Sequence, residues 1–414
     1  MSIENKMPEI RFKRFGGEWE NLTLGENAKF FKGQGYSKGD LVTNGAPIIL
    51  YGRLYTRYQT VITAVDTFVT EKDKSVKSIG GEVIVPASGE SPEDISRASV
   101  VSEPNIILGG DLNIVLPNKK IHPIFLALAI SNGRLKKHLS SKAQGKSVVH
   151  IRNSDLADLD LILPSEYIEQ TAIGNYFQKL DTLINQHQQK HDKLSNIKKA
   201  MLEKMFPKQG ETIPEIRFKG FSPEWKYDGI TNISKVFIGL VTTMTTSYRN
   251  QGVLLIRNSD IKSNRFEFSA NPIYLDSKFA DGNSSRKLML GDVVTVHTGD
   301  VGTSAVITKK EEGSIGFATI VSRPNKNIID SNYLSVFFNT DMHKNFAMNV
   351  STGDGRANYN LKDFYKLNVP LPTVDEQVKI GLFFQKLDAL INHHQQQITK
   401  LNNIKQACLS KMFV

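Results

Sequence analysis

The sequence predicts a mixed α+β (α/β) protein built as an internal duplication, with two similar globular domains that are each followed by a long helix. Three observations predict this fold. The two ends of a unit of about 207 residues occur twice along the chain. The end of each unit has apolar residues at heptad spacing. The region between the ends contains short β-rich segments bounded by Gly, Pro or Asn.

The duplication is visible at both ends of the unit. Residues 8–20 and 214–226 match at nine of thirteen positions, and residues 173–206 and 380–413 match at 23 of 34. Residues 21–166 and 227–374, which lie between these ends, align poorly. We therefore expect one scaffold used twice, with divergent segments that contact two different things. We expect globular domains at 1–165 and 208–372 and long helices at 166–207 and 373–414.

The divergent regions have mixed secondary structure with a bias toward strands. Short runs of Val, Ile and Leu predict strands at 47–50, 61–63, 82–85, 106–108, 253–256 and 293–296. Longer apolar patterns predict helices at 122–138 and 331–347.

The repeated C-terminal segments are predicted to be long helices that pair. Their apolar spacing alternates between four and three, with one irregularity at Leu194–Ile197. Thirty-four residues make a rod of about 50 Å. Because one chain carries two nearly identical seams, we expect them to pack as an intramolecular coiled coil rather than each on its own domain. The seam residues are Ile173, Phe177, Leu180, Ile184, Leu194, Ile197, Met201, Ile380, Phe384, Leu387, Ile391, Ile398, Leu401, Ile404 and Cys408.

Composition limits the classes of function. The chain carries 52 Lys and Arg against 42 Asp and Glu, a net charge of +10, which favours a polyanionic partner such as nucleic acid. A basic protein without such a partner is the alternative. The single cysteine, Cys408, excludes a disulfide framework and fits a reducing cytoplasm. The longest apolar stretch, near 124–130, is far shorter than the roughly 20 residues of a membrane span.

Motifs for catalysis or cofactor binding are incomplete. Residues 145–147 read Gly-Lys-Ser, like the end of a phosphate-binding loop, but position 140 is Ser instead of Gly and the following residues favour an extended strand. Residues 33–35 read Gly-Gln-Gly and lack the third glycine of a dinucleotide fingerprint. The nine histidines do not cluster with carboxylates at metal-ligand spacing. We therefore expect no catalytic residues, no metal and no cofactor on this chain.

Clusters of polar, basic and aromatic residues lie in both divergent regions. Such side chains bind phosphates and read base edges, so they are the candidates for contact with DNA. The first region contributes Lys32, Gln34, Tyr36, Lys38, Arg53, Tyr55, Arg57, Gln144, Lys146, Ser147 and His150. The second region contributes Thr243, Thr245, Thr246, Ser247, Arg249, Ser285, Arg286, Lys287, His297, Arg356, Asn358 and Tyr359.

These features resemble the specificity subunit of type I restriction–modification enzymes over essentially the whole chain. The first mark is the tryptophan that opens each unit, Trp19 and Trp225. The second is Leu-Pro followed by Glu-Gln, at 163–170 and 371–377. The third is Lys-Leu-Asp-x-Leu-Ile at 179–184 and 386–391.

The resemblance implies a non-catalytic subunit of a bacterial, cytoplasmic complex. In this family each divergent region is a target-recognition domain that reads one half of a split double-stranded DNA sequence. The two helices are implied to pack antiparallel, as a spacer that helps to dock two modification subunits. Those adenine methyltransferase subunits carry S-adenosylmethionine, and restriction subunits add translocation and cleavage that need ATP and Mg²⁺.

Two other functions remain open from the sequence. One is a stand-alone DNA-binding adaptor or regulator, which would bind DNA without a methyltransferase partner. The other is a nuclease with an unrecognised active site, which a metal-dependent cleavage assay would detect.

Overall fold

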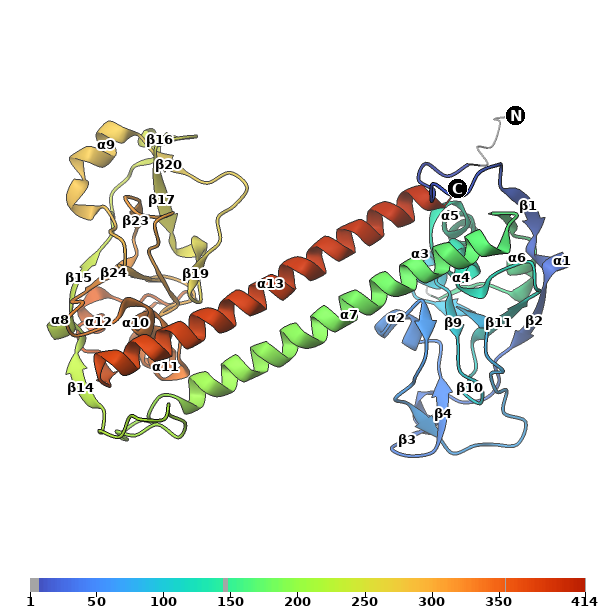
Figure 1. Ribbon diagram of the computed structural model, residues 1–414, viewed down its shortest axis with the longest axis horizontal. Helices are drawn as coiled ribbons and strands as arrows, with labels where there is room; N and C mark the ends of the chain where they lie inside the picture. Colours follow the sequence, from blue (N-terminus) through green and yellow to red (C-terminus); the bar gives the residue numbers. More distant parts are fainter. Residues whose placement is uncertain (1–6, 144–147, 354, 414) are drawn as a thin grey trace. The chain divides into compact units, whose positions relative to one another are not determined.

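The computed structural model describes residues 7–143, 148–353 and 355–413 of the chain. It divides into two compact units, residues 1–187 with 397–414, and residues 188–396 (Figure 1). The long helices are α7 (Tyr167–Lys204) and α13 (Val374–Met412). Each unit therefore contains one globular domain, the beginning of the helix that follows this domain, and the end of the other long helix.

The first unit is built on an open five-stranded sheet in the order β2-β11-β7-β9-β5. A four-stranded sheet, β10-β4-β6-β3, lies at the end of the unit away from α7, as Figure 1 shows. The small pairs are β1 with β13 and β8 with β12. The strands are β1 (Glu20–Thr23), β2 (Ala28–Lys32), β3 (Leu41–Val42), β4 (Ala46–Ile49), β5 (Val61–Ile62), β6 (Phe68–Val69), β7 (Glu82–Pro86), β8 (Ser88–Gly89), β9 (Ser99–Val101), β10 (Ile107–Leu108), β11 (Leu112–Pro117), β12 (Val149–His150) and β13 (Asp160–Leu163).

The second unit repeats this plan with changes. Its sheets are β15-β24-β21-β22 and β16-β20-β17-β23, with the pairs β14-β25 and β18-β19. The strands are β14 (Lys226–Gly229), β15 (Ser234–Ile238), β16 (Tyr248–Arg249), β17 (Val253–Arg257), β18 (Ile261–Lys262), β19 (Arg265–Phe266), β20 (Tyr274–Leu275), β21 (Val293–Thr295), β22 (Ser304–Val306), β23 (Ile315–Phe317), β24 (Ile320–Pro324) and β25 (Asn368–Leu371).

The shared plan is clearest in four strand pairings. Antiparallel β1-β13 corresponds to β14-β25, and β2-β11-β7 corresponds to β15-β24-β21. The parallel pair β4-β10 corresponds to β17-β23. All six predicted strands are present, so the β-rich segments between the repeated ends belong to one scaffold used twice.

Short helices complete both units. In the first they are α1 (Leu24–Asn27), α2 (Arg53–Thr56), α3 (Pro92–Ile95), α4 (Pro123–Ser131), α5 (Gly133–Lys142), α6 (Asn153–Ala157) and the 3₁₀ turn η1 (Lys38–Asp40). In the second they are α8 (Ile230–Ile233), α9 (Ser277–Gly282), α10 (Ser331–Phe338), α11 (Asp341–Val350), α12 (Leu361–Phe364) and the turns η2 (Thr245–Ser247), η3 (Asn258–Asp260) and η4 (Ser284–Arg286).

The helices predicted at 122–138 and 331–347 are each two helices, which corrects the expectation. The first breaks between α4 and α5 at Gly133, which has a left-handed φ of +59°. A Cβ at this position would make only an ordinary contact of 3.4 Å with the Cβ of Phe413, so it is the left-handed turn that favours glycine. The second breaks between α10 and α11, where the hydroxyl of Thr340 caps α11 by accepting from the N–H of His343.

The repeated ends of the units attach each domain to its long helix. In the first turn of α7, the buried Glu169 accepts two hydrogen bonds of 2.7 Å from the guanidinium of Arg11. In α13, Glu376 is held in the same way by Arg217. Two parallel charge-assisted bonds fix both distance and angle, which explains the repeated Glu-Ile-Arg-Phe motif.

The glutamine that follows each glutamate ties the helix start to the chain before α4 or α10. The side-chain amide of Gln170 donates to the carbonyls of Lys120 and Pro164, and its oxygen accepts from the N–H of His122. Gln377 makes the equivalent three bonds in the second unit. Because all of these groups are buried or partly buried, each bond also avoids the cost of an unpaired polar group.

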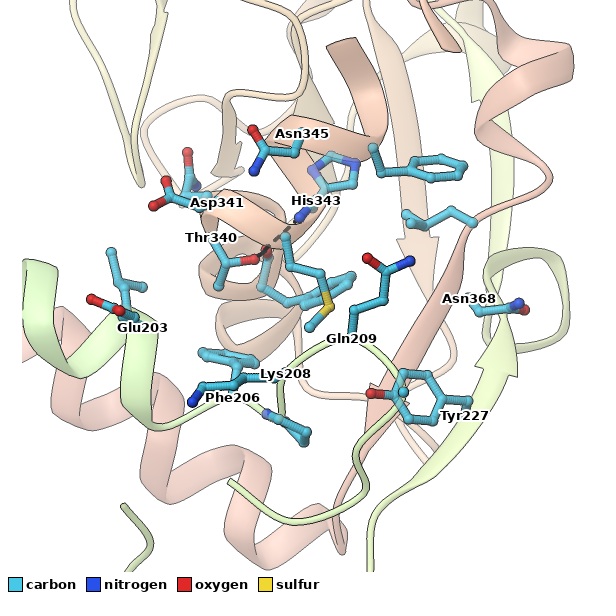
Figure 2. A pocket seen from close by; sticks show the side chains of 18 of the residues that line it. Glu203, Phe206, Lys208, Gln209, Tyr227, Thr340, Asp341, His343, Asn345 and Asn368 are labelled. Atoms are coloured by element: carbon cyan, nitrogen blue, oxygen red, sulfur yellow. Dashed lines mark hydrogen bonds between the residues drawn. The ribbon is translucent and has the colours of Figure 1, made fainter. Parts of the chain in front are cut away.

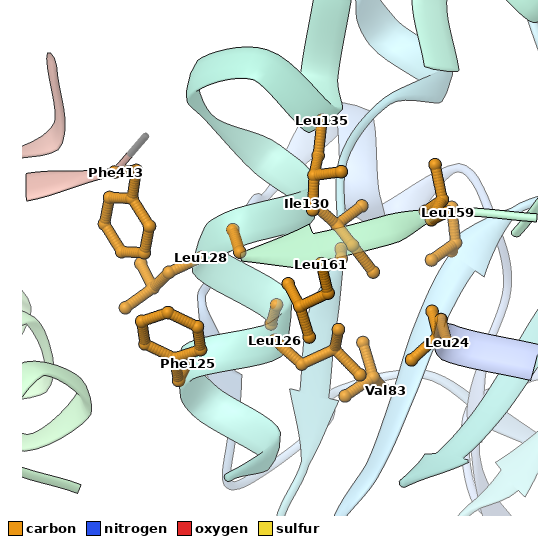
Figure 3. Close-up of a cluster of buried hydrophobic side chains, with 14 of the residues drawn as sticks. Leu24, Val83, Phe125, Leu126, Leu128, Ile130, Leu135, Leu159, Leu161 and Phe413 are labelled. Atoms are coloured by element: carbon orange, nitrogen blue, oxygen red, sulfur yellow. The ribbon is translucent and has the colours of Figure 1, made fainter. Parts of the chain in front are cut away.

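Each hydrophobic core is completed by the end of the other long helix. In the first unit, Phe413 at the end of α13 packs on Phe125 and Phe177, with ring centroids 5.5 and 6.0 Å apart (Figure 3). In the second unit, Phe206 packs on Trp225 and Tyr333. Burying one such aromatic side chain contributes on the order of 2–3 kcal/mol, so the repeated Met-Phe ending is a structural anchor.

The two long helices run antiparallel within each unit. In the first unit, Leu401, Ile404 and Cys408 of α13 pack against the core that contains the start of α7. In the second unit, Leu194 and Met201 of α7 pack against the core that contains the start of α13.

In α7 the seam is more regular than the sequence indicated, whereas in α13 the equivalent Ile404 does pack against the first core. The predicted irregularity at Ile197 is wrong, because Ile197 is 36% exposed and lies outside both hydrophobic cores. Lys198 takes the next position, and its side chain is only 15% exposed. The alternating spacing of four and three residues therefore continues along α7, with Lys198 at this seam position. An apolar-only search for the seam misses this position.

Candidate nucleic-acid interface

In both units, the divergent loops begin where two backbone segments cross at very short distance. The N–H of Gly33 donates to the carbonyl of Leu112, and the N–H of Gly239 donates to that of Thr319. A Cβ would lie 1.8 Å from the carbonyl oxygen of Gly109 at the first position and 2.2 Å from that of Gly316 at the second. Only glycine permits such an approach, so this crossing belongs to the shared scaffold. The variable chemistry begins at the next residue.

In the first unit, some predicted DNA contacts hold their own loops instead. Tyr36 is buried; its hydroxyl accepts from the N–H of Lys72 and bonds to the hydroxyl of Ser75. The side chain of Arg53 is 9% exposed and pairs with Asp66 at 2.9 Å. Because these groups are engaged within their own loop, we leave Tyr36 and Arg53 out of the candidate DNA contacts.

Tyr55 is also a structural residue. Its hydroxyl donates to the carbonyl of Ser88 on β8. Burial, the largest cause, raises the pKa of Tyr55 well above its usual value, and nearby Tyr51 and Asp94 raise it further. Tyr55 is therefore left out of the candidate DNA contacts as well.

The remaining predicted residues of the first unit are exposed where the structure describes them. Lys32 ends β2, Gln34 follows the glycine crossing, and Lys38 begins the turn η1. The side chain of Arg57 is 60% exposed and contacts Asp66. Gln144, Lys146 and Ser147 lie outside the described residues.

In the second unit, most of the predicted polar residues are accessible, and they lie in the turns η2 and η4 or beside them. Thr243, Thr245, Thr246 and Ser285 are exposed, and Ser247 is half-buried. Arg249 is half-exposed and lies 3.6 Å from Asp276. Arg286 and Lys287 are partly committed, because Arg286 donates to the carbonyl of Ile238 and Lys287 pairs with Asp281.

A second cluster of predicted residues lies where two chain segments pair. We call this place the strand corner. In the first unit it is the pair β8-β12, where Ser88 is opposite His150. In the second unit it is an isolated bridge between Thr298 and Asn358. The N–H of Ile151 donates to the carbonyl of Ala87 at 3.0 Å in the first corner.

The same backbone bond recurs in the second corner, where the N–H of Tyr359 donates to the carbonyl of His297 at 2.8 Å. The two corners therefore have equivalent backbones. Their side chains differ, since Ser88 and His150 stand where the second corner has Thr298 and Asn358.

The second corner carries a cation. The guanidinium of Arg356 lies against Gly299, within 4 Å of the position that a Cβ on residue 299 would take. Arg356 is exposed, and among the described residues no carboxylate forms an ion pair with it. Its position in the first unit is taken by Val148, so the two corners differ in charge at this position.

Two other predicted residues near this corner are less accessible than expected. Tyr359 is fully buried in the core with its hydroxyl 3.4 Å from Nε2 of His343, which corrects its prediction as a DNA contact. His297 is partly buried, and this burial lowers its pKa. Its Nδ1 bonds to the hydroxyl of Thr298, which in turn donates to Asn358 at 2.8 Å.

Sequence reasoning missed Ser88 and Asn258. The side-chain oxygen of Asn258 accepts from the N–H of His297, so Asn258 supports the second corner. The signal that could have found it is the pentapeptide Ile-Arg-Asn-Ser-Asp, which occurs at 151–155 and again at 256–260. In both copies the aspartate caps the turn by accepting from the arginine N–H.

A pocket of about 850 Å³ lies in the second unit between the end of α7, the loop after it and α11 (Figure 2). Phe206, Met342 and Phe346 line it, with Lys208 and Asp341 among its polar residues. Its buried histidine, His343, bonds to the carbonyl of Phe338, and burial lowers the pKa of His343 to about 4. With this histidine neutral and engaged, we assign the pocket no catalytic role.

Within the described part of the chain, no three His, Cys, Asp or Glu side chains gather as metal ligands do. No helix there combines the length and the apolar composition needed to cross a membrane.

Comparison with known proteins identifies the family. The model of the type I restriction modification DNA specificity domain matches residues 16–196 and 233–403, and the chain belongs to this family. The specificity subunit of the Escherichia coli type I restriction enzyme EcoBI is 28% identical over 169 residues, which cover 39% of this chain and 35% of that protein. The EcoDI specificity subunit of E. coli is 24% identical over 68% of this chain and 67% of that protein.

A solved structure has the same fold over nearly the full length. It is the S subunit of a type I restriction–modification system from M. genitalium, with 14% sequence identity and a TM-score of 0.61. The match covers 99% of both chains. The duplicated mixed α/β fold predicted from the sequence is therefore confirmed.

Proposed function

We propose that this chain is the DNA-specificity subunit of a type I restriction–modification complex, and that each globular domain reads one half of a bipartite, asymmetric target. The observation that carries the proposal is the strand corner, which has one backbone and two sets of side chains. Different donors, acceptors and charges select different base edges. Two such corners in one chain suit two different half-sites.

The candidate DNA contacts are the predicted residues that remain accessible, together with the segment outside the described residues. In the first domain, 1–165, they are Lys32, Gln34, Lys38, Arg57, Gln144, Lys146, Ser147 and His150. In the second domain, 208–372, they are Thr243, Thr245, Thr246, Ser247, Arg249, Ser285, Arg286, Lys287, His297, Arg356 and Asn358. The net charge of +10 supports binding to the phosphate backbone.

The repeated helical segments, 166–207 and 373–414, are proposed to dock two modification subunits, one for each copy. Because the chain itself is proposed to be non-catalytic, S-adenosylmethionine belongs to those subunits. ATP and Mg²⁺ belong to restriction subunits of the full complex. The assembly acts on DNA in the bacterial cytoplasm, where it associates with the nucleoid.

Mapping methylated adenines genome-wide tests the proposal. Cells that express the modification subunit with and without this chain are compared. We expect one split motif to be methylated only when the chain is present. A chain that binds DNA tightly when purified alone, with no dependent methylation, is a stand-alone regulator and contradicts the proposal.

An exchange of one divergent region tests the assignment of half-sites. Replacing residues 21–160 with the matching region of a related chain should change one half of the methylated motif. The other half should stay the same, because residues 208–372 are untouched. A change in both halves would show that the two domains do not read DNA separately.

The Arg356→Ala variant tests the second strand corner in the assembled methyltransferase. If Arg356 contacts phosphate, the slope of log K against log salt should fall by about 0.9 for all sequences. If it reads a guanine edge, discrimination should fall by about 1–3 kcal/mol at one position of the second half-site. The control is Lys226→Ala, an exposed cation on β14 outside the corner. Unchanged affinity at every salt concentration removes Arg356 from the interface.

A further inference from the structure

One aspartate on each long helix joins three parts of the structure. These are Asp181 on α7 and Asp388 on α13, the acidic residues of the repeated Lys-Leu-Asp motif. In the first unit, Oδ1 of Asp181 accepts from Nζ of Lys405 on α13. In the second unit, Oδ1 of Asp388 accepts from Nζ of Lys198 on α7. Each ion pair therefore crosses from one long helix to the other within its own unit.

The second oxygen of each carboxylate is bound by the globular domain. In the first unit, Oδ2 of Asp181 accepts from the hydroxyl of Thr60 at 3.2 Å. In the second unit, Oδ2 of Asp388 accepts from the side-chain amide of Asn264, also at 3.2 Å. Thr60 and Asn264 come from the divergent regions, whereas the aspartates and lysines are repeated. We call the two groups the first clamp (Thr60, Asp181, Lys405) and the second clamp (Asn264, Asp388, Lys198).

The residues from the domains are themselves firmly held. Thr60 is 3% exposed, and its carbonyl accepts from the N–H of Val100 in the main sheet. Asn264 has a left-handed φ of +58° in the β18-β19 turn, and its N–H donates to the carbonyl of Ser304. Its side-chain oxygen also accepts from Ser335 and Asn339. A force on either clamp is therefore transmitted to the body of the domain.

Each clamp lies at a distance from the other polar anchor of its domain. Asp181 follows Glu169 by twelve residues, and Asp388 follows Glu376 by twelve. At 1.5 Å per residue, the two anchor points on each helix are about 18 Å apart. One point of attachment at the helix start permits the domain to pivot, but a second point at this distance along a rigid helix fixes its angle.

The clamps are shielded enough for their charges to matter. The side chains of Asp181 and Lys405 are 26% and 16% exposed, and those of Asp388 and Lys198 are 20% and 15% exposed. Partly buried charges of opposite sign attract more strongly than exposed ones, and like charges in the same place repel more strongly.

We propose that the two clamps are positioning devices, which set the angle of each domain on the helix pair and so the number of base pairs that separates the two half-sites. This rests on the proposed function. Thr60 and Asn264 are then the residues through which each divergent region adjusts its own angle. Neither clamp includes a candidate DNA contact, and among the described residues no hydrogen bond or ion pair joins a clamp to the strand corner of its domain. Loss of a clamp should therefore relax the spacing without changing either half-sequence.

The test uses the full chain assembled with its modification subunits and a series of DNA duplexes. The duplexes carry the mapped motif with its natural spacer or with one base pair more or fewer. Lys405→Met removes the charge and keeps most of the side-chain volume. We expect the preference for the natural spacer to fall about tenfold, the order of what one charge-assisted hydrogen bond contributes. Discrimination within each half-site should not change.

A pair of double variants with identical composition separates the clamp from a general loss of stability. Asp181→Lys with Lys405→Asp reverses the first clamp and keeps opposite charges together, and the hydroxyl of Thr60 can accept from the new lysine. Asp181→Lys with Lys198→Asp places like charges in both clamps. We expect the first variant to recover the natural spacing and the second to lose it.

A measurement without DNA completes the test. Hydrogen exchange at the N–H of Val100, which bonds to Thr60, should become faster in Lys405→Met and return toward normal in the matched reversal. Should Lys405→Met fail to fold, Thr60→Val removes only the hydroxyl and provides the same comparison, with a smaller loss of spacing preference.

The outcomes that overturn the clamp differ from those that overturn the function. If the wild-type complex prefers one spacer and the folded Lys405→Met or Thr60→Val variant keeps that preference, the clamp proposal is wrong. Equal behaviour of the two double variants also contradicts it. If the wild-type complex shows no split motif at all, the proposed function fails instead, while the exchange measurement still reports on the clamp.

Discussion

At the scale of single residues, a buried carboxylate has the strictest need for hydrogen-bond partners. Glu376 has no exposed surface at the start of α13, and Arg217 supplies two hydrogen bonds of 2.7 Å. The bonds to Glu376 raise the pKa of Arg217, against the opposing effect of burial. A buried ion pair adds little net stability over an apolar pair, but removing one partner leaves an unpaired charge in the core.

We therefore expect Arg217→Met to destabilise the second unit by about 3–5 kcal/mol. The chain has two tryptophans, one in each core, so Trp19→Phe leaves Trp225 as the fluorescent reporter of the second unit. Urea unfolding in that background measures the change. The double variant Arg217→Met with Glu376→Met removes both charges and should recover most of the loss. A loss below 1 kcal/mol for the single variant would contradict the argument.

His343 makes the stability of the second unit depend on pH. Burial lowers the pKa of His343 from 6.5 to about 4, so the unfolded chain binds this proton more tightly than the folded one. The stability that results is complete above about pH 6.5 and is lost as the pH falls toward 4. The full difference is on the order of 3 kcal/mol, and roughly 2 kcal/mol should be lost between pH 7 and pH 5.

Unfolding of the Trp19→Phe chain at pH 7 and pH 5, with Trp225 as reporter, measures this dependence. His343→Leu should have a smaller difference between the two pH values, whatever its absolute stability. His150→Gln, at an exposed position of the first unit, is the control and should not alter the difference. An unchanged difference in His343→Leu would assign the pH dependence to other groups.

At the scale of elements, the long helices separate buried seam positions from exposed ones on the same helix. Leu180 is 7% exposed in the first core, and Ile197 is 36% exposed. Leu180→Asp buries an unpaired carboxylate and should cost several kcal/mol, about the price of burying an unsatisfied polar group. Ile197→Asp should change stability by less than about 0.5 kcal/mol. Thermal unfolding of the two variants compares them, and equal losses would contradict the observed seam.

Periodicity and repetition predicted these elements well because both are local properties of the sequence. The strand at 82–85 and the heptad from Ile173 to Leu180 needed no knowledge of distant residues. The break at Gly133 was missed because the apolar pattern continues across it, and periodicity does not show the left-handed φ of +59° that interrupts the helix. Contacts between distant residues decide which polar residues are accessible. Arg53 and Arg356 look alike in sequence, but Arg53 pairs with Asp66, whereas Arg356 forms no ion pair with a carboxylate among the described residues.

At the scale of the whole molecule, each long helix contributes residues to both units. Helix α7 begins in the first unit, where Phe177 is buried, and ends in the second, where Phe206 is buried. Helix α13 begins with Phe384 buried in the second unit and ends with Phe413 buried in the first. A change in the length of one helix alone would therefore place its terminal phenylalanine out of register with the core that receives it.

This connection governs how the spacing between half-sites can be altered. Four residues, about one turn, lengthen a helix by about 6 Å, and base pairs rise about 3.4 Å each. If the helices set the distance between the reading domains, inserting four residues after both Gln188 and Gln395 should add one to two base pairs between unchanged half-sequences. Four residues turn a helix by about 400°, so the seam shifts by only about 40° and pairing should survive. The same insertion after Gln188 alone should instead weaken the docking of Phe206, which Trp225 fluorescence reports. Methylation mapping reads the spacing of the double insertion directly. A folded double insertion that still methylates the original motif would show that the length of the helices does not set the distance.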